Sequence, residues 1–291
     1  MGWRNALETF ATATGYRQVR RIQAERFPQD TAARIIRDEP LPFDEEREMK
    51  AIVTGHSRGL GAAIAETLLA SGVAVLGLAR HGNASLAARY PQLLRELAID
   101  LTDVAALQRW LAGDALQQFL VGCPSILLIN NAGTIQPVAP VGSPEDAAIA
   151  RALNLNVVTP LILANAVIAA ASEVPEKRIL HVSSGAARSP YPGWSVYCAS
   201  KAALDQHARS VALDEVAGLR IASVAPGVID TDMQAEIRAA SPTSFPLRGK
   251  FEDLQRNGQL ADARECAGRL VAYLLDDGFG AEPVADLRDR P

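Results

Sequence analysis

The chain has 291 residues, of which 48% are hydrophobic and 21% are charged, an ordinary composition for a globular protein. Its formal net charge of −4 argues against a general binder of nucleic acid or of anionic membranes. The three cysteines lie far apart without a CxxC pair, so we expect neither a disulfide framework nor a metal site. No apolar run reaches the length of a membrane span and no apolar signal core opens the chain, which together predict a cytoplasmic protein.

The first 48 residues differ in composition from the rest. They are rich in arginine and acidic residues, and the run DEPLPFDEERE at 38–48 is typical of a linker or arm. We therefore predict an N-terminal extension over residues 1–48. Two interpretations stay open: an arm that packs on a neighbouring subunit, or an over-long gene start that precedes a natural start at Met49.

From Met49 onward, short apolar runs alternate with longer helical patterns. This alternation predicts a single-domain α/β fold over residues 49–291, a Rossmann-type doubly wound parallel β-sheet of about seven strands with helices on both faces. The mixed stretch 231–259 has the length and composition of a substrate-covering lid. The expected strands are 50–54, 73–79, 95–99, 125–129, 178–182, 220–224 and 283–287, and the expected helices are 60–71, 103–119, 144–171 and 196–217.

A glycine-rich turn, TGHSRGLG at residues 54–61, joins the first expected strand to the first expected helix. Gly55, Gly59 and Gly61 allow the backbone to turn tightly and to approach a diphosphate at the helix N-terminus, where amide groups favour anions. The TGxxxGxG spacing differs from the general GxGxxG fingerprint, but its place between strand and helix indicates a dinucleotide site.

The end of the second expected strand indicates which dinucleotide binds. An NAD site usually carries an acidic residue there for the ribose 2′-hydroxyl, whereas an NADP site presents arginine to the 2′-phosphate. This sequence reads VLGLARHGN at 75–83, with Arg80 and no acidic residue. Arg58 in the glycine-rich turn is a second candidate cation, so we expect NADP(H) in preference to NAD(H).

The segment HVSSGAARSPYPGWSVYCASK at 181–201 carries the candidate chemistry. Tyr197 and Lys201 are four residues apart and share a helix face. A nearby ammonium group lowers the pKa of a phenol, which makes tyrosine a usable general acid or base. A serine at the end of the preceding strand, Ser183 or Ser184, can hold a carbonyl oxygen against the tyrosine. NNAG follows the fourth expected strand, and the next helix contains two asparagines, Asn154 and Asn156.

The order of these motifs resembles the short-chain dehydrogenase/reductase family over roughly residues 49–287. The resemblance implies that Ser184, thirteen residues before Tyr197, is the catalytic serine. It also implies that Asn156, in preference to Asn154, holds a water for proton relay and that Lys201 contacts the nicotinamide ribose as well. The cofactor-binding positions that it implies, together with those named above, are Thr54, Gly55, Ser57, Arg58, Gly59, Leu60, Gly61, Arg80, Asp100, Leu101, Asn131, Ala132, Gly133, Tyr197, Lys201, Pro226, Gly227, Val228 and Thr231.

Two further implications concern assembly and substrate class. Family members are homodimers or homotetramers, and the helices expected at 144–171 and 196–217 would form the dimer contact. The terminal run EPVADLRDRP departs from the family's usual end, so the choice between dimer and tetramer stays open. The stretch 224–260 resembles sepiapterin reductase and its bacterial benzil-reductase-like relatives.

We therefore expect an NADPH-dependent oxidoreductase that reduces a ketone, aldehyde or diketone, with Tyr197 as general acid/base. A small-molecule substrate is expected, with no nucleic-acid or membrane partner. Two alternatives stay open. One is an NAD-dependent alcohol dehydrogenase of the same fold, and the other is a dinucleotide-sensing protein without turnover.

Overall fold

The structure is a computed structural model that describes residues 34–35 and 49–290. They belong to one compact unit, Ala33–Pro291. The expected extension over residues 1–48 therefore lies outside the described residues, except for β1 (Arg34–Ile35). This two-residue strand pairs antiparallel with β4 (Leu94–Ala98), a pairing that no sequence pattern indicated.

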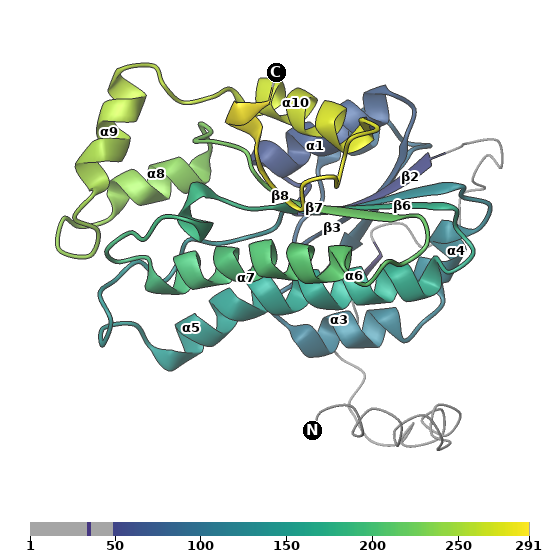
Figure 1. Ribbon diagram of the computed structural model, residues 1–291, viewed down its shortest axis with the longest axis horizontal. Coiled ribbons are helices and arrows are strands. Elements are labelled where there is room, and N and C mark those ends of the chain that lie inside the picture. Colours follow the sequence, from purple (N-terminus) through teal and green to yellow (C-terminus); the bar gives the residue numbers. More distant parts are fainter. Residues whose placement is uncertain (1–33, 36–48, 291) are drawn as a thin grey trace, which may run out of the picture. The chain divides into compact units, whose positions relative to one another are not determined.

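Seven parallel strands form the central sheet, which confirms the predicted doubly wound fold (Figure 1). The strands stand in the order β4-β3-β2-β5-β6-β7-β8, with β1 beyond β4 at the edge. The order reverses between β2 and β5, and in such sheets the ligand binds at the carboxyl ends of the strands beside this reversal. The remaining strands are β2 (Met49–Thr54), β3 (Ala74–Ala79), β5 (Ser125–Asn130), β6 (Glu176–Val182), β7 (Leu219–Ala225) and β8 (Val284–Asp286).

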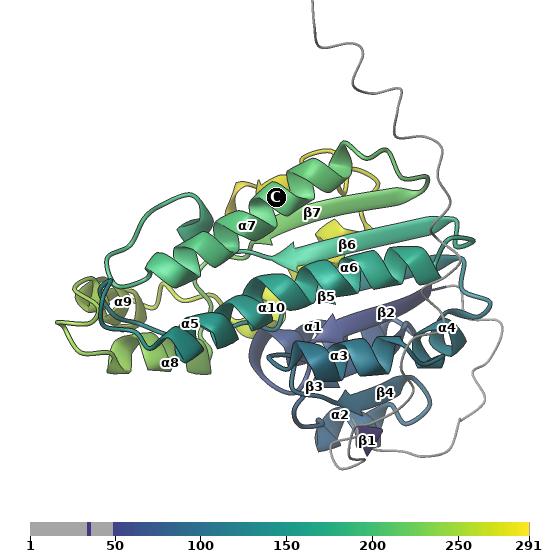
Figure 2. The same ribbon diagram turned by 90° about the horizontal axis from the view of Figure 1, so that it is seen from below.

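Helices cover both faces of the sheet (Figures 1 and 2). One face packs against α1 (Gly59–Ala70) and α10 (Ala263–Leu275), which also pack against each other. The other face packs against α3 (Val104–Leu111), α4 (Ala115–Leu120), α6 (Thr159–Ala170) and α7 (Ser195–Ala212). The short helix α2 (Ala84–Arg89) follows β3 and was not predicted from the sequence.

Strand β2 shows how one short apolar run supplies both cores. Val53 packs on the side of α1 and α10, whereas its neighbour Ile52 packs on the side of α3 and α6. Successive strand residues point to opposite faces, so a parallel strand that is covered on both sides must be apolar throughout. Each such fully buried side chain contributes about 1.5–3 kcal/mol of stabilisation.

Two of the expected helices differ from their predicted form. The run expected at 103–119 is two helices, because the chain turns at Ala112–Asp114 between α3 and α4. The run expected at 144–171 comprises α5 (Asp146–Leu153), a π-helical turn (Asn154–Val158) and α6. A π-helical turn inserts a residue into the helical repeat and is frequent at functional sites.

The expectation that no apolar run reaches membrane-span length is wrong for residues 146–170. This stretch of 25 residues is long and apolar enough to cross a membrane by length and composition alone. Leu163, Ala164 and Val167 of α6 pack against the sheet and its covering helices. We therefore interpret part of this apolar surface as the face that packs within the fold.

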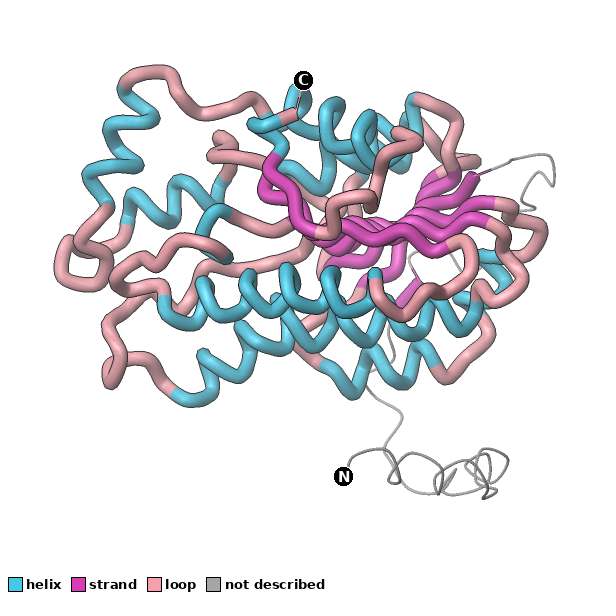
Figure 3. The backbone as a smooth tube through the Cα atoms, in the orientation of Figure 1, coloured by secondary structure: helices cyan, strands magenta, loops and turns pink. Residues whose placement is uncertain are grey.

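The predicted lid, residues 231–259, contains two helices, α8 (Asp232–Ala239) and α9 (Arg248–Arg256), joined by a loop (Figure 3). Its loop passes close to Gly193, which lies in the segment before α7. Gly193 has φ +80°, and a Cβ atom there would lie 2.1 Å from the carbonyl oxygen of Ser244. Only glycine fits this contact, which fixes the lid loop against the chain that enters α7.

We predict that Gly193→Ala lowers the free energy of unfolding by at least about 2 kcal/mol, because it combines a strained backbone with a collision. Gly122→Ala is the matched control: Gly122 has φ +68°, and nothing lies within 4 Å of an added Cβ atom. The control should lose only about 1 kcal/mol. Urea unfolding of both variants measures the difference, and equal losses would show that the Ser244 contact is unimportant.

Candidate active site

The glycine-rich turn between β2 and α1 has the shape that the sequence predicts. Gly55 and Gly59 have φ +72° and +56°, and a Cβ atom at Gly61 would lie 2.1 Å from the carbonyl oxygen of Gly55. Helix α1 begins without a side-chain cap on its first turn. A helix start without a cap presents amide donors to an anion, so the turn fits the diphosphate of a nicotinamide dinucleotide.

The NNAG segment after β5 lies directly against this turn. The hydroxyl of Thr54 accepts hydrogen bonds from the backbone amides of Asn131 (2.9 Å) and Ala132 (3.0 Å). The side-chain amide of Asn131 donates to the backbone carbonyl oxygen of Thr54 at 3.0 Å. A Cβ atom added at Gly55 would lie only 3.1 Å from the Cα atom of Ala132. These bonds join the carboxyl ends of β2 and β5 at the order reversal of the sheet.

A buried histidine, which sequence reasoning missed, connects the turn to the segment after β3. His56 is fully buried, and its Nε2 lies 2.8 Å from Oε1 of Glu96 on β4. The same carboxylate oxygen accepts from the backbone amide of Asn83 at 2.6 Å, and the Asn83 side chain donates to the carbonyl oxygen of Ser57. This network therefore fixes the stretch that follows Arg80. No local spacing could reveal it, because its partners are up to 40 residues apart.

The two candidate arginines have different surroundings. Arg80 is exposed at the end of β3. Arg58 pairs with Asp232 on α8 of the lid at 2.6 Å, and both side chains are about two-thirds exposed. Arg58 therefore connects the glycine-rich turn to the lid. The sequence analysis did not predict this pairing with Asp232.

The other predicted cofactor positions line the same edge of the sheet. After β4, exposed Asp100 accepts two hydrogen bonds from Thr102, and the carbonyl oxygen of buried Leu101 accepts from Thr159. After β7 come Pro226, Gly227 with φ +91°, and Val228, followed by Thr231 at the start of α8. A Cβ atom at Gly59 would lie 3.6 Å from Cγ2 of Thr231, so this segment reaches the glycine-rich turn.

Tyr197 lies on the buried face of α7 beside Ser184, which starts the 3₁₀ turn Gly185–Ala187. The Ser184 hydroxyl accepts a hydrogen bond from the amide of Ala186 at 3.1 Å. Burial raises the pKa of Tyr197 to about 12, and a hydrogen bond with Ser184 acts in the opposite direction. The sequence analysis expected Lys201 to lower this pKa, but removal of the phenol from water raises it instead.

Lys201 is buried one helical turn after Tyr197, and its Nζ donates to the carbonyl oxygen of Val182 at 2.8 Å. The Nζ lies 5.8 Å from the centre of the Tyr197 ring. Burial lowers the pKa of Lys201 to about 8, and Asp205 opposes this effect. The ammonium group therefore loses its proton much more readily than an exposed lysine.

Asn156 and Asn154 point to different places, because the π-helical turn separates them. The Asn156 side chain forms two hydrogen bonds with the backbone of Thr134, at 2.9 and 2.8 Å, and donates to Ser200 on α7 at 3.1 Å. Asn154 instead donates to the carbonyl oxygen of Thr102. A Cβ atom at Gly133 would lie 3.3 Å from Oδ1 of Asn156 and 3.6 Å from Nζ of Lys201. Asn156 is therefore the asparagine that lies beside Lys201.

An aromatic wall forms where the segment before α7 meets the lid. Trp194 stacks on Phe245 with ring centres 4.5 Å apart, and it meets Tyr197 edge-on at 5.4 Å. Tyr191 and Phe251 pack against the same indole. We call these residues (Tyr191, Trp194, Phe245 and Phe251) the aromatic wall. The predicted lid, residues 231–259, therefore contributes two of its rings, Phe245 and Phe251.

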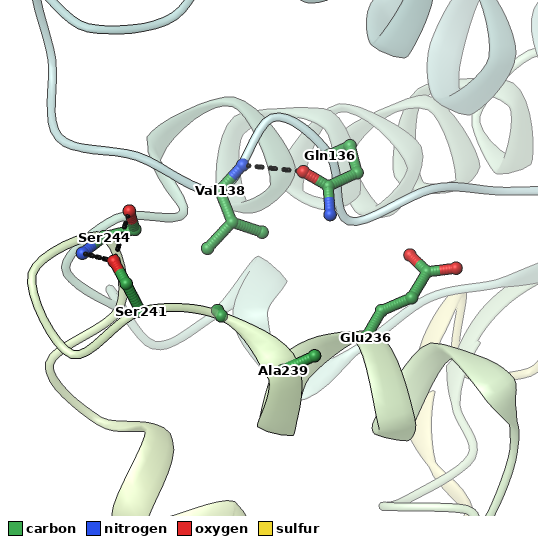
Figure 4. Close-up of a pocket in the computed structure, with 7 residues that line it drawn as sticks. Gln136, Val138, Glu236, Ala239, Ser241 and Ser244 are labelled. Atoms are coloured by element: carbon green, nitrogen blue, oxygen red, sulfur yellow. Dashed lines mark hydrogen bonds between the residues drawn. The ribbon is translucent and has the colours of Figure 1, made fainter.

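A cavity of about 260 Å³ lies beyond this wall, between the loop after β5 and the end of α8 (Figure 4). Its lining is half polar and includes Gln136, Glu236, Ser241 and Ser244. Val138 and Ala240, which also line it, pack against the apolar cluster that contains Tyr197. The cavity therefore lies next to the site without including any of its candidate catalytic residues.

Comparisons with known proteins agree with this geometry. Over 232 residues the chain is 35% identical to a benzil reductase ((S)-benzoin forming) of Bacillus cereus, covering 77% of this chain and 93% of the relative. It is 34% identical to the sepiapterin reductase of Meriones unguiculatus, with 82% and 95% covered. A solved short-chain dehydrogenase/reductase from Burkholderia vietnamiensis is 47% identical, with a TM-score of 0.61 and 84% and 99% covered. The family model for short chain dehydrogenases matches residues 49–242, so the chain belongs to the short-chain dehydrogenase/reductase family of NAD(P)-dependent oxidoreductases.

Proposed function

We propose that the protein reduces a ketone, aldehyde or diketone to an alcohol with NADPH. The observation that carries this proposal is that Ser184, Tyr197 and Lys201 lie together at the carboxyl ends of the strands, next to a glycine-rich turn shaped for a dinucleotide. Asn156 reaches the same place from the π-helical turn. The benzil reductase and sepiapterin reductase relatives support carbonyl reduction as the direction.

Each side chain has one task in the proposed reaction. A bound nicotinamide dinucleotide supplies the hydride that the carbonyl carbon accepts. Ser184 donates a hydrogen bond to the carbonyl oxygen, and Tyr197 transfers its phenolic proton to that oxygen as negative charge develops there. Lys201 stabilises the phenolate that remains and contacts the ribose. Asn156 and Ser200 extend the polar chain away from Lys201 for return of the proton.

The ionisation state of Tyr197 supports a role as proton donor in carbonyl reduction. A phenol whose pKa is raised to about 12 keeps its proton throughout the physiological range. Reduction requires this protonated form, whereas alcohol oxidation requires the phenolate. The free site therefore holds Tyr197 in the form from which carbonyl reduction starts.

Arg80 supports NADPH as the reductant. It is exposed at the end of β3, where no acidic side chain follows to bind a ribose 2′-hydroxyl. The segment after it is fixed by the hydrogen bonds of Asn83 to Glu96 and Ser57. A guanidinium group on a fixed loop is suited to bidentate contact with a 2′-phosphate.

The aromatic wall supports an aromatic, largely apolar carbonyl compound as substrate. Benzil is a diketone that carries two aromatic rings, and the aromatic wall packs against Tyr197 through Trp194. Aromatic pairs contribute about 0.5–1.5 kcal/mol beyond their buried area. Benzil is therefore the substrate with which we would first test the protein.

The remaining proposals concern assembly and organisation. We propose a catalytic domain at 49–291 with its lid at 231–259, in a cytoplasmic protein. The apolar run 146–170 packs only partly against the sheet, which supports a homodimer formed through α5, α6 and α7.

Replacing Tyr197 by Phe should lower kcat/KM for benzil reduction at least 100-fold, because the ring remains and only the transferable proton is lost. The dissociation constant for NADPH should change less than about threefold, because the hydroxyl is only one of many contacts. Tyr90→Phe, a change at the half-buried Tyr90 after α2, is the control and should keep parent activity. A Tyr197→Phe protein that reduces benzil at the parent rate would refute the mechanism.

Replacing Arg80 by Gln should raise the dissociation constant for NADPH at least tenfold, because a charge-assisted hydrogen bond to phosphate is lost. The dissociation constant for NADH should change less than about threefold, because NADH lacks the 2′-phosphate. Fluorescence titration of both cofactors measures this, with Arg109→Gln on the exposed side of α3 as control. Tighter binding of NADH than of NADPH by the parent protein would instead support the NAD-dependent alternative.

A further inference from the structure

Asp205 is a buried carboxylate on the same helix face as the proposed catalytic pair. Tyr197, Lys201 and Asp205 follow each other at four-residue intervals on α7, and all three are buried. Asp205 is only 2% exposed. A carboxylate in such a place loses much hydration and is found there only with polar or charged partners. Its partners therefore indicate what it does.

Those partners come from the segments that surround Ser184. One carboxylate oxygen, Oδ1, accepts hydrogen bonds from the hydroxyls of Ser183 and Ser223, each at 2.7 Å. The other, Oδ2, lies 3.5 Å from Nε of Arg188. Asp205 thus ties α7 to the end of β6, to β7 and to the turn after Ser184.

The position of Ser184 depends on both of its tethered neighbours. Ser183 precedes it directly and is held by Asp205, while Arg188 follows the 3₁₀ turn that Ser184 begins. Arg188 also donates to the carbonyl oxygen of Ala285 on β8. The hydroxyl of Ser184 is therefore placed against Tyr197 by a carboxylate on the helix that carries Tyr197 itself.

The charge of Asp205 also acts on Lys201. The titratable and charged groups around Lys201 in the described part of the chain are Tyr197 and Asp205 from α7 and His181 from β6, with Arg188 behind Asp205. Burial lowers the pKa of His181 to about 3, so this ring is neutral at physiological pH. Asp205 is then the negative group that offsets the burial of the Lys201 ammonium.

We propose that Asp205 is a positioning residue of the reductase centre. It holds the Ser184 hydroxyl in place through Ser183 and Arg188, and it supports the positive charge of Lys201. The first part rests on the proposed function, because it assigns Ser184 a task in carbonyl reduction. The second part concerns the protonation of one lysine and is measurable without turnover.

The decisive variant is Asp205→Asn, which keeps the shape and the acceptor for both serines but removes the charge. Loss of a negative charge lowers the pKa of every acid nearby, and the newly unpaired Arg188 acts in the same direction. The midpoint of the Lys201 titration should therefore lie about one pH unit lower than in the parent protein. The alkaline fall of kcat/KM for benzil reduction should move down by about the same amount, with kcat reduced about tenfold.

Lysine ¹³C NMR reads the first of these shifts directly. The chain has four lysines, Lys50, Lys177, Lys201 and Lys250, so the Cε signals are few and a Lys201→Met protein assigns the one in the site. The parent signal should titrate near pH 8. An unchanged midpoint in folded Asp205→Asn would overturn the charge proposal, and an unchanged kcat would overturn the positioning proposal.

Three further proteins separate a specific role from general damage. Ser223→Ala removes one hydrogen bond but keeps the charge, so it should lower the melting temperature by a few degrees and leave the Lys201 midpoint in place. Asp277→Asn, at an exposed aspartate after α10, should match the parent in every measurement. If Asp205→Asn does not fold, Arg188→Gln serves instead. It removes a positive charge and should move the Lys201 midpoint upward by about half a pH unit; no movement would overturn the proposal.

The failure of this inference is distinguishable from the failure of the proposed function. A parent protein that reduces no carbonyl compound refutes the proposed function and, with it, the assigned task of Ser184. The Lys201 midpoint still decides the charge part in that case, because the NMR titration needs neither cofactor nor substrate.

Discussion

A buried ammonium group is the constraint on which the site depends. Lys201 lies inside the protein at the carboxyl edge of the sheet and donates to the backbone carbonyl of Val182. Such a charge is tolerated only where polar partners surround it, and segments from several parts of the fold lie around it here. The NNAG loop brings Gly133 against the Lys201 Nζ, the π-helical turn brings Asn156, and α7 itself brings Asp205.

The same burial sets the chemistry of the neighbouring phenol. Removal from water holds the proton on Tyr197, so the group is a proton donor that releases its proton only when a strong base forms beside it. In the reaction that we propose, the carbonyl oxygen gains negative charge and becomes such a base. In the same proposal the Lys201 ammonium group stabilises the phenolate, and Asp205 helps that ammonium group to keep its proton. The acid, its stabiliser and the group that supports the stabiliser thus lie on one helix face.

Much of the fold and the linear part of the site could be predicted from sequence. Seven apolar runs predicted the parallel strands, because strands covered on both faces must be apolar throughout. Gly55, Gly59 and Gly61 could be recognised because their spacing and their place between strand and helix are local features. Tyr197 and Lys201 are local as well, since four residues form one helical turn.

The remaining features depend on contacts that no local pattern contains. Glu96 meets His56 from 40 residues away, and Arg58 meets Asp232 across 174 residues. Ser183 was set aside in favour of Ser184, yet it has its own partner in Asp205, which only the packing of β6 against α7 reveals. The raised pKa of Tyr197 was also unpredictable, because sequence shows the neighbouring charge but not the degree of burial. The break between α3 and α4 and the π-helical turn likewise follow from tertiary packing.

The central claim is that this chain carries out hydride transfer from NADPH to a carbonyl carbon. The most direct measurement is to incubate the protein with benzil and with NADPH that carries deuterium in place of both hydrogens at C4 of the nicotinamide, and to analyse the product by mass spectrometry. The account predicts benzoin with one deuterium on its carbinol carbon. The absence of benzoin and of every other reduced carbonyl product across a panel of ketones, diketones and pteridines, or a product without deuterium, would contradict it.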